Sequence, residues 1–344
     1  MGEAQAAPGE ALGIAAGGPD GRRLGRTSGR TGVKTSERVL SSLEALGADG
    51  WRARIVPAEH IRDLEASLQG SHDQGLFDET FYQERLTVFS FAPPESLPDA
   101  RSLIVVAIPV PQTQVVFHWR GEPRPAILPP TYVAYGRTRE RAQARLATLL
   151  GGEGYRVAGT QLPLKLLAVC AGLAEYGRNN ICYVPGMGSF LQLAACVSDL
   201  PAEDDPWREP VMMERCQSCT ACQRLCPTGA IGQDRFLLHA ERCLTFHNER
   251  GGPFPDWIDP SWHNALLGCR ECQRCCPEDK GVWEWVAEGG SFSEEETALI
   301  LGGASRDQLP PAIIERLREL DLLDDLGTLA RNLSVLLEAQ LLPG

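Results

Sequence analysis

The residues of this chain with the plainest chemical role are cysteines gathered within about 60 residues. Three of them are separated by two residues each and are followed by a cysteine–proline pair: Cys216, Cys219, Cys222 and Cys226-Pro227. A second set begins with an isolated cysteine and ends in the same way: Cys243, Cys269, Cys272 and Cys276-Pro277. This spacing is typical of two [4Fe–4S] clusters in which the fourth cysteine of each run binds the other cluster.

The crossed pattern assigns four ligands to each cluster. One cluster takes Cys216, Cys219, Cys222 and Cys276, and the other takes Cys226, Cys243, Cys269 and Cys272. Short spacing lets successive thiolates converge on one cubane, and each proline prevents the chain from continuing as a helix after the crossover cysteine. We therefore expect two neighbouring clusters between which electrons can pass.

Structural zinc and disulfides are the alternatives. Two zinc sites would also use eight thiolates, but they require neither a third cysteine at the same spacing nor the cysteine–proline endings. Disulfides do not suit a chain without a visible signal peptide. The remaining cysteines, Cys170, Cys182, Cys196 and Cys275, are out of register and are expected to be non-ligands, most simply buried small side chains.

The 344 residues have room for more than the cluster module. We expect a disordered tail over 1–35, which is poor in large apolar side chains, an α/β domain over 36–205, a double-cluster ferredoxin-like domain over 206–285, and helices over 286–344. No apolar run approaches the roughly 18 residues of a membrane span, so we expect a cytoplasmic protein without membrane partners.

Hydrophobic periodicity predicts alternating strands and helices before the cysteines. The expected helices are Glu37–Leu46, Ala58–Leu68 and Thr138–Leu150, the expected strands are Ser102–Pro109, Ile181–Val184 and Ala194–Val197, and the proline-rich stretch Trp119–Pro130 is expected to be a loop. After the cysteines, helices are expected at Glu294–Leu301, Pro311–Leu323 and Leu326–Gln340. This pattern indicates an α/β or α+β arrangement of sheet and helices.

The net charge is concentrated in one half of the chain. Residues 201–344 contain 13 Lys/Arg and 25 Asp/Glu, a balance of −12, whereas residues 1–200 contain 20 of each. Nucleic-acid binders draw much of their affinity from basic side chains that neutralise phosphates. This balance therefore argues against a nucleic-acid partner and for a small-molecule substrate.

Glycines and small polar residues cluster before the first cysteine run. They comprise Gly172-Leu173, Gly177-Arg178-Asn179-Asn180, Pro185-Gly186, Gly188-Ser189-Phe190 and Ser198-Asp199-Leu200-Pro201. Glycine allows backbone to approach a bulky ligand, and Arg and Asn supply donors, although ordinary turns would use the same residues.

The order of these segments, followed directly by the two cysteine runs, resembles the epoxyqueuosine reductases and, more distantly, the reductive dehalogenases. The likeness extends from Ser102 to Pro277, and Leu329–Leu333 is similar to part of the helical tail of the former family. It implies a nitroreductase-like α/β domain that holds base-off cobalamin, to which the clusters deliver electrons from a low-potential donor such as flavodoxin or ferredoxin. It also implies that Gly177, Arg178, Asn179, Asn180, Gly186, Gly188, Ser189 and Phe190 border the corrin.

The chain differs from that family at the expected proton donor. Arg137 stands where those reductases carry an aspartate, and Tyr176, Glu175 and Tyr135 are possible substitutes. Arg137 could instead pair with a carboxylate or phosphate of a small substrate. The leading hypothesis is therefore a cobalamin-dependent iron–sulfur reductase. Its substrate is expected to be a small molecule and not tRNA. The alternatives are a tRNA epoxyqueuosine reductase and a non-catalytic protein that transfers electrons or reduces cobalamin.

Overall fold

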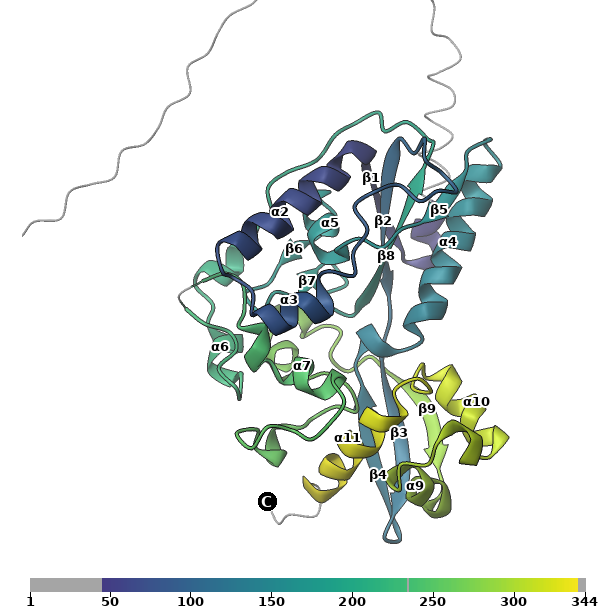
Figure 1. Ribbon diagram of the computed structural model, residues 1–344, viewed down its shortest axis with the longest axis vertical. Helices are drawn as coiled ribbons and strands as arrows, with labels where there is room; N and C mark the ends of the chain where they lie inside the picture. Colours follow the sequence, from purple (N-terminus) through teal and green to yellow (C-terminus); the bar gives the residue numbers. More distant parts are fainter. Residues whose placement is uncertain (1–44, 234, 340–344) are drawn as a thin grey trace, which may run out of the picture.

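A four-stranded antiparallel sheet forms the centre of the larger lobe in the computed structural model, which describes residues 45–233 and 235–339 (Figure 1). The strand order is β1 (Arg52–Pro57), β2 (Ser102–Pro109), β8 (Leu191–Ser198) and β5 (Val157–Gly159). β2 and β8 are buried along almost their whole length, as the β-branched run of β2 predicts. The mixed fold is confirmed, and its main sheet is antiparallel throughout.

Helices cover both faces of this sheet (Figure 1). α4 (Tyr135–Gly151) packs on one face, where Ala142, Leu146 and Leu150 contact apolar residues of β2 and β8. On the other face lie α2 (Ile61–Asp73) and α5 (Leu164–Cys170), with α3 (Glu79–Arg85) beyond them. The predicted helix over 138–150 is thus confirmed, whereas most of the helix predicted at Glu37–Leu46 and all of the tail 1–35 lie outside the described residues.

A second sheet extends away from the first, in the order β4 (Glu122–Leu128), β3 (Gln112–Trp119) and β9 (Val286–Phe292). The loop predicted for Trp119–Pro130 is wrong, because β4 pairs with β3 through a tight turn at Arg120 and Gly121, both with positive φ. Pro123 and Pro125 are tolerated because β4 is an edge strand, where a missing N–H need not break a ladder.

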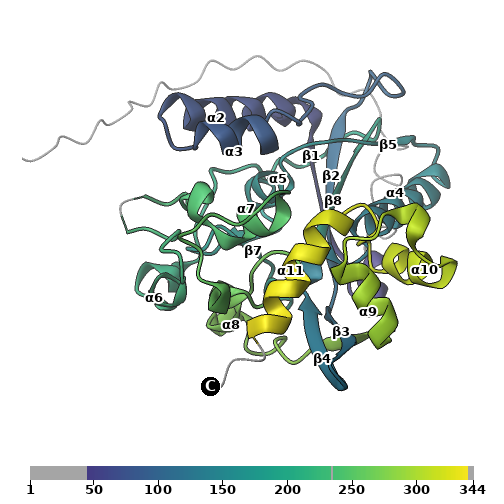
Figure 2. The same cartoon turned by 60° about the horizontal axis from the view of Figure 1, so that its bottom comes forward.

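The C-terminal segment packs on this second sheet (Figure 2). β9 pairs in parallel with β3, and α9 (Glu294–Leu301), α10 (Pro311–Glu319) and α11 (Leu326–Ala339) follow it. Phe117 stacks on Phe292 with ring centroids 5.1 Å apart. The C-terminal helices therefore share one core with residues 112–128, and this part of the molecule is not continuous in sequence.

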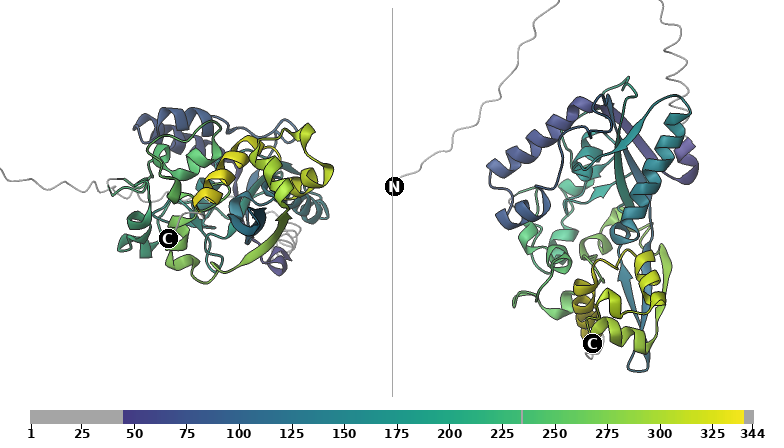
Figure 3. Two further views of the ribbon diagram at one scale, coloured as in Figure 1. Left: turned by 90° about the horizontal axis from the view of Figure 1, so that it is seen from below. Right: turned by 45° about the vertical axis from the view of Figure 1, so that its right-hand side comes forward.

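The α-helices that the structure describes in the cysteine-rich segment are short, and the segment lies beside both sheets (Figures 1 and 3). They are α6 (Ala221–Leu225), α7 (Leu244–Glu249) and α8 (Glu271–Arg274), with β6 (Glu175–Tyr176) and β7 (Cys182–Tyr183) forming a small hairpin next to them. In the described part of the chain, no helix has the length and apolar character needed to cross a membrane.

Candidate metal centre

Four cysteines from opposite ends of the cysteine-rich segment line one cavity. Cys216, Cys219 and Cys222 come from the turn and helix around α6, and Cys276 comes from the residues that follow α8. The space between the lining atoms is about 350 Å³ and is partly open to solvent. The other lining residues are Gly177, Arg178, Asn179, Tyr183, Met213, Arg215, Ala221, Pro277 and Glu278. These four cysteines are the set that the crossed pattern assigns to one cluster.

The other four assigned cysteines are also mutual neighbours. Burial raises the pKa of the Cys243 thiol to about 11, and the nearby Cys269 and Cys226 add to the effect. Burial likewise raises the pKa of Cys272 well above its ordinary value, with contributions from Cys269, Cys243, Cys222 and Cys226. Cys226 thus lies near the second set, although in sequence it ends the first run.

Both sets suit cubane clusters better than a single ion. Among residues 45–233 and 235–339, no three His, Cys, Asp or Glu side chains converge closely enough to hold one metal ion. A [4Fe–4S] cluster does not need such convergence, because each of its thiolates binds a different iron. A cationic cluster would also offset the cost of burying four thiolates close together, which these raised pKa values reflect.

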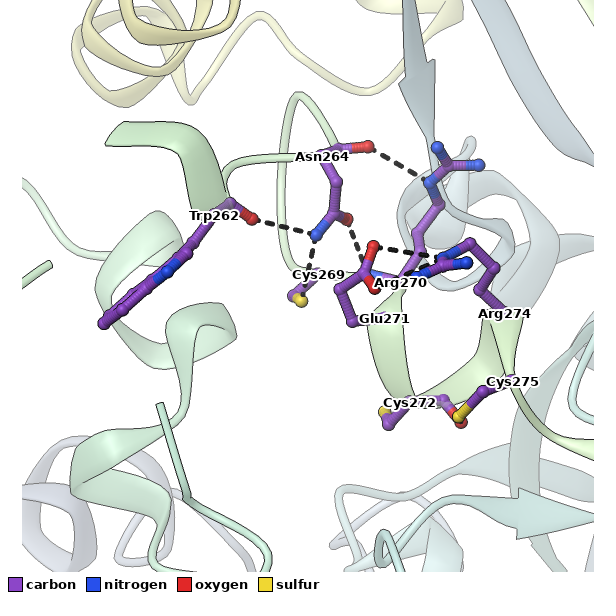
Figure 4. A network of polar contacts seen from close by, with 8 residues as sticks. All are labelled: Trp262, Asn264, Cys269, Arg270, Glu271, Cys272, Arg274 and Cys275. Atoms are coloured by element: carbon purple, nitrogen blue, oxygen red, sulfur yellow. Dashed lines mark hydrogen bonds and ion pairs between the residues drawn. The ribbon is translucent and has the colours of Figure 1, made fainter. Parts of the chain in front are cut away.

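Side chains outside the cysteine runs donate hydrogen bonds to sulfur. The Asn264 amide nitrogen lies 3.3 Å from the Cys269 sulfur (Figure 4). Thr245 lies within hydrogen-bonding reach of Cys243, and the Tyr183 hydroxyl lies within reach of Cys276. Asn264, Thr245 and Tyr183 are not recognisable in the sequence as partners of the cysteines, because nothing in their spacing marks them.

The loops predicted to border a corrin contact the cysteine-rich segment. The Ser189 backbone N–H and hydroxyl each lie 2.7 Å from a carboxylate oxygen of Asp279, and the Asn180 amide donates to the Phe236 carbonyl at 3.0 Å. The Arg178 guanidinium donates to the carbonyl oxygens of Cys216 and Cys219. These side chains therefore fasten the larger lobe to the cysteine-rich segment.

The glycines in these loops are also explained by contacts within the protein. At Gly188, whose φ is +59°, a Cβ would lie 2.5 Å from an Asp279 carboxylate oxygen. At Gly177, a Cβ would lie 2.4 Å from the Asn179 side-chain oxygen. Phe190 is buried, whereas Gly186 is exposed. Close packing of protein against protein thus accounts for Gly177 and Gly188.

The predicted catalytic residues lie in two separate places. Tyr176 and Glu175 form β6, directly before the Gly177–Asn179 loop that lines the cavity. Arg137 lies in the first turn of α4, and its guanidinium donates to the carbonyl oxygen of Glu319 at the end of α10. Tyr176 and Glu175 are therefore next in sequence to the loop that lines the cavity but are not among its lining residues, while Arg137 contacts the C-terminal helices.

The cysteines expected to be non-ligands have ordinary surroundings. Cys170, Cys182 and Cys196 are buried, and burial raises their thiol pKa values to about 11, 12 and 12. Cys275 is partly buried, with its sulfur 3.6 Å from the Cys272 carbonyl oxygen. Their exclusion from the clusters stays a prediction.

Comparison with known families identifies the class of this site. The model of a "4Fe-4S double cluster binding domain" matches residues 215–279, a range that contains all eight assigned cysteines. The chain therefore carries a double [4Fe–4S] cluster domain, and the prediction of two such clusters is confirmed.

The homologues indicate a narrower class of protein than the cluster domain does. The epoxyqueuosine reductase of Bacillus subtilis is 36% identical over 124 residues, which are 35% of this chain and 30% of that protein. The epoxyqueuosine reductase of Staphylococcus aureus is 27% identical over 238 residues, 65% of this chain and 60% of that protein. The chain thus spans less than two thirds of the length of these relatives. Epoxyqueuosine reductases are its homologues, so the resemblance predicted from the motifs is confirmed.

Solved structures of the same class share the fold. The epoxyqueuosine reductase of Streptococcus thermophilus aligns with a TM-score of 0.64 at 20% identity and covers 88% of this chain and 81% of that one. Another epoxyqueuosine reductase, solved with an epoxyqueuosine-modified tRNA-Tyr stem loop, aligns with a TM-score of 0.60 at 20% identity and covers 89% and 82%. A nitroreductase-like arrangement is a finer description that these alignments do not establish.

The tRNA-bound relative overturns one expectation. An epoxyqueuosine reductase with the same fold binds a modified tRNA stem loop, and this finding contradicts the predictions of a small-molecule substrate and of no nucleic-acid partner. The net charge of residues 201–344 is a property of the whole segment and is not the charge of a binding surface. RNA responds to the local potential where it docks, and a balance of −12 over 144 residues does not describe that potential.

Proposed function

We propose that this chain is an iron–sulfur reductase of the epoxyqueuosine reductase type that acts on a modified nucleoside in tRNA. The observation that carries the proposal is the cavity in which Cys216, Cys219 and Cys222 meet Cys276 from the far end of the segment. That arrangement suits a crossed double-cluster module, which the family match over residues 215–279 supports, and the homologues of this chain are epoxyqueuosine reductases. A low-potential donor such as flavodoxin or ferredoxin would supply the electrons.

The chain's own residues keep the two clusters close together. Cys222 lies within α6, and Cys226 directly follows the end of that helix, yet the two belong to different cluster sets. Because one short helix connects both sets, the clusters must be neighbours. Bound clusters supply one-electron transfer, and burial of the sulfur ligands limits access of water to them.

Reduction of an epoxide to an alkene consumes two electrons and two protons and releases the oxygen as water. A proton donor near the substrate is therefore required. The Tyr176 hydroxyl carries a proton at neutral pH, although burial raises its pKa and so makes it a weaker acid than an ordinary tyrosine. Glu175 precedes it in β6 and is only partly buried. We propose this pair as the proton source. The Arg137 guanidinium donates to the Glu319 carbonyl oxygen at the C-terminal end of α10, where a cationic donor is favourable. We propose that Arg137 stabilises this helix end.

Cobalamin is a finer prediction that comes from the resemblance. The residues predicted to border it do not fit that role well, because Ser189, Asn180 and Arg178 direct their polar groups to Asp279, to the Phe236 region and to the cysteine backbone. We therefore derive no step through cobalamin. Titration with cob(II)alamin, followed by electron paramagnetic resonance, tests the prediction. A five-coordinate base-off signal without nitrogen splitting would support it, and the unchanged spectrum of the free cofactor at saturating protein would refute it.

The test of the proposed activity is reduction of a defined RNA in vitro. Anaerobically reconstituted protein is supplied with a chemical reductant and an epoxyqueuosine-containing tRNA stem loop, with and without added cobalamin. Mass spectrometry of the nucleosides should show loss of one oxygen atom. Protein that holds both clusters, yet leaves the epoxide intact in both mixtures, would contradict the proposal.

A further inference from the structure

The Asn264 side chain is aimed at a cluster ligand in an orientation that its other contacts fix (Figure 4). Its side-chain oxygen lies 2.8 Å from the backbone nitrogen of Arg270. A backbone N–H can only donate, so the oxygen must face Arg270 and the NH₂ group must face the other way. That NH₂ group lies 3.0 Å from the Trp262 carbonyl oxygen and 3.3 Å from the Cys269 sulfur.

The backbone of Asn264 is held as firmly as its amide. The Arg270 guanidinium donates to the Asn264 carbonyl oxygen at 3.1 Å and to the Gln112 side-chain oxygen at 2.8 Å. The same guanidinium lies over the Trp283 ring, 5.2 Å from its centroid. Gln112 belongs to β3, so the second sheet, the Trp283 ring and the cysteine segment together position one N–H towards one sulfur.

An N–H···S hydrogen bond favours the state in which the sulfur carries more negative charge. Reduction adds an electron to the cluster and increases the negative charge on its thiolates, so such a bond raises the reduction potential. Partners outside the ligand set tune metal centres in this way. We propose that Asn264 is a positioning residue that sets the reduction potential of the cluster bound by Cys226, Cys243, Cys269 and Cys272.

The other cluster has a donor of different origin. The Tyr183 hydroxyl, which accepts a hydrogen bond from the Asn179 amide at 2.9 Å, lies within hydrogen-bonding reach of the Cys276 sulfur. Tyr183 belongs to β7 and Asn264 precedes α8, so the two donors do not share a partner. Each cluster can therefore be perturbed without changing the side-chain donor of the other.

The test is a redox titration of the holoprotein monitored by electron paramagnetic resonance. This inference rests on the proposed clusters, so iron and sulfide are counted in every sample before the titration. Asn264→Ala removes the donor, and Asn264→Asp keeps the shape but places a carboxylate oxygen beside the Cys269 sulfur. We expect one of the two potentials to fall in Asn264→Ala and to fall further in Asn264→Asp. The matched variant Tyr183→Phe should lower only the other potential.

Several outcomes would overturn the inference. Unchanged potentials in Asn264 variants that retain both clusters would overturn the role of Asn264 and leave the proposed function standing. Preparations of the unsubstituted protein without iron would overturn both. If the variants do not fold, the hydrogen bond is tested in the unsubstituted protein with ¹⁵N in its asparagine side chains. Pulsed electron paramagnetic resonance of the reduced cluster should then show a coupling to nitrogen. Absence of this coupling would refute the hydrogen bond.

Discussion

Replacement of Cys226 by alanine tests the crossed arrangement of the clusters. In sequence, Cys226 ends the first cysteine run, but its neighbours in space include Cys243, Cys269 and Cys272. The cavity of the first set is lined by Cys216, Cys219, Cys222 and Cys276 without Cys226. Cys226→Ala should therefore damage the cluster formed by the second run and leave the first cluster in place.

The magnitude follows from the stoichiometry. Intact protein should hold about eight iron and eight sulfide, and loss of one cubane should leave about four of each. In the fully reduced protein, spin quantitation should fall from about two spins to about one, and magnetic interaction between neighbouring clusters should disappear. Cys275→Ala is the control, because Cys275 directly precedes the ligand Cys276 without being an assigned ligand itself, so its loss should leave about eight iron.

The assay must also identify which cluster is lost. The Tyr183→Phe substitution, placed in the Cys226→Ala background, supplies the marker because Tyr183 contacts the Cys276 sulfur of the first set. If the remaining cluster is the first one, its potential should shift with Tyr183→Phe. A remaining cluster that does not respond to Tyr183→Phe but responds to Asn264→Ala would refute the crossed assignment.

Two further predictions concern stability. Burial lowers the pKa of His263 from 6.5 to about 4, so its contribution to stability is complete above about pH 6.5 and is lost as the pH falls towards 4. Between pH 7 and 5 the free energy of unfolding of the holoprotein should fall by roughly 2 kcal/mol more than that of the His263→Phe variant. Thermal unfolding at the two pH values measures this difference. Parallel pH profiles of the two proteins would contradict the prediction. Asn332 is buried and donates to the carbonyl oxygens of Asn248 and Leu266 at 2.9 and 2.8 Å. Asn332→Ala should lower the free energy of unfolding by about 2 kcal/mol or more, because two buried acceptors lose their donor. Ser334→Ala on the same helix should lower it by about 0.5 kcal/mol at most. Equal losses of stability in the two variants would contradict this role of Asn332.

Patterns in the sequence predicted the helices and strands whose type is determined by residues close to one another in the chain. The β-branched run at β2 and the apolar spacing of α4 each fix the element type without reference to the rest of the chain. The cysteine spacing likewise predicted the double-cluster domain that the family match confirms at residues 215–279.

Features that depend on distant partners were not predictable in this way. The strand β4 contains two prolines and reads as a loop until its pairing with β3 makes it an edge strand. The parallel pairing of β3 with β9 joins residues about 170 apart, a contact that no local pattern indicates. Asn264 is recognisable as a sulfur partner only when the fold brings Arg270 and Trp262 around it.

The substrate expectation failed for a related reason. In the sequence alone, the net charge of residues 201–344 and the arginine at position 137 both favour a small substrate. In the structure, Arg137 contacts the Glu319 carbonyl, so its departure from the family pattern has a structural use that the sequence does not reveal. Composition over a long segment can therefore exclude a generally basic surface, but it cannot exclude a local site for RNA.

The most direct test of the central claim is the nucleoside content of tRNA in a bacterial strain that lacks epoxyqueuosine reductase. The chain is expressed in that strain, and queuosine and epoxyqueuosine are quantified in its tRNA by mass spectrometry, with Cys276→Ala and Cys275→Ala as paired controls. The account predicts that the unsubstituted chain and Cys275→Ala restore queuosine and that Cys276→Ala does not. If the unsubstituted chain is expressed with both clusters present and the tRNA retains only epoxyqueuosine, the proposed function is contradicted.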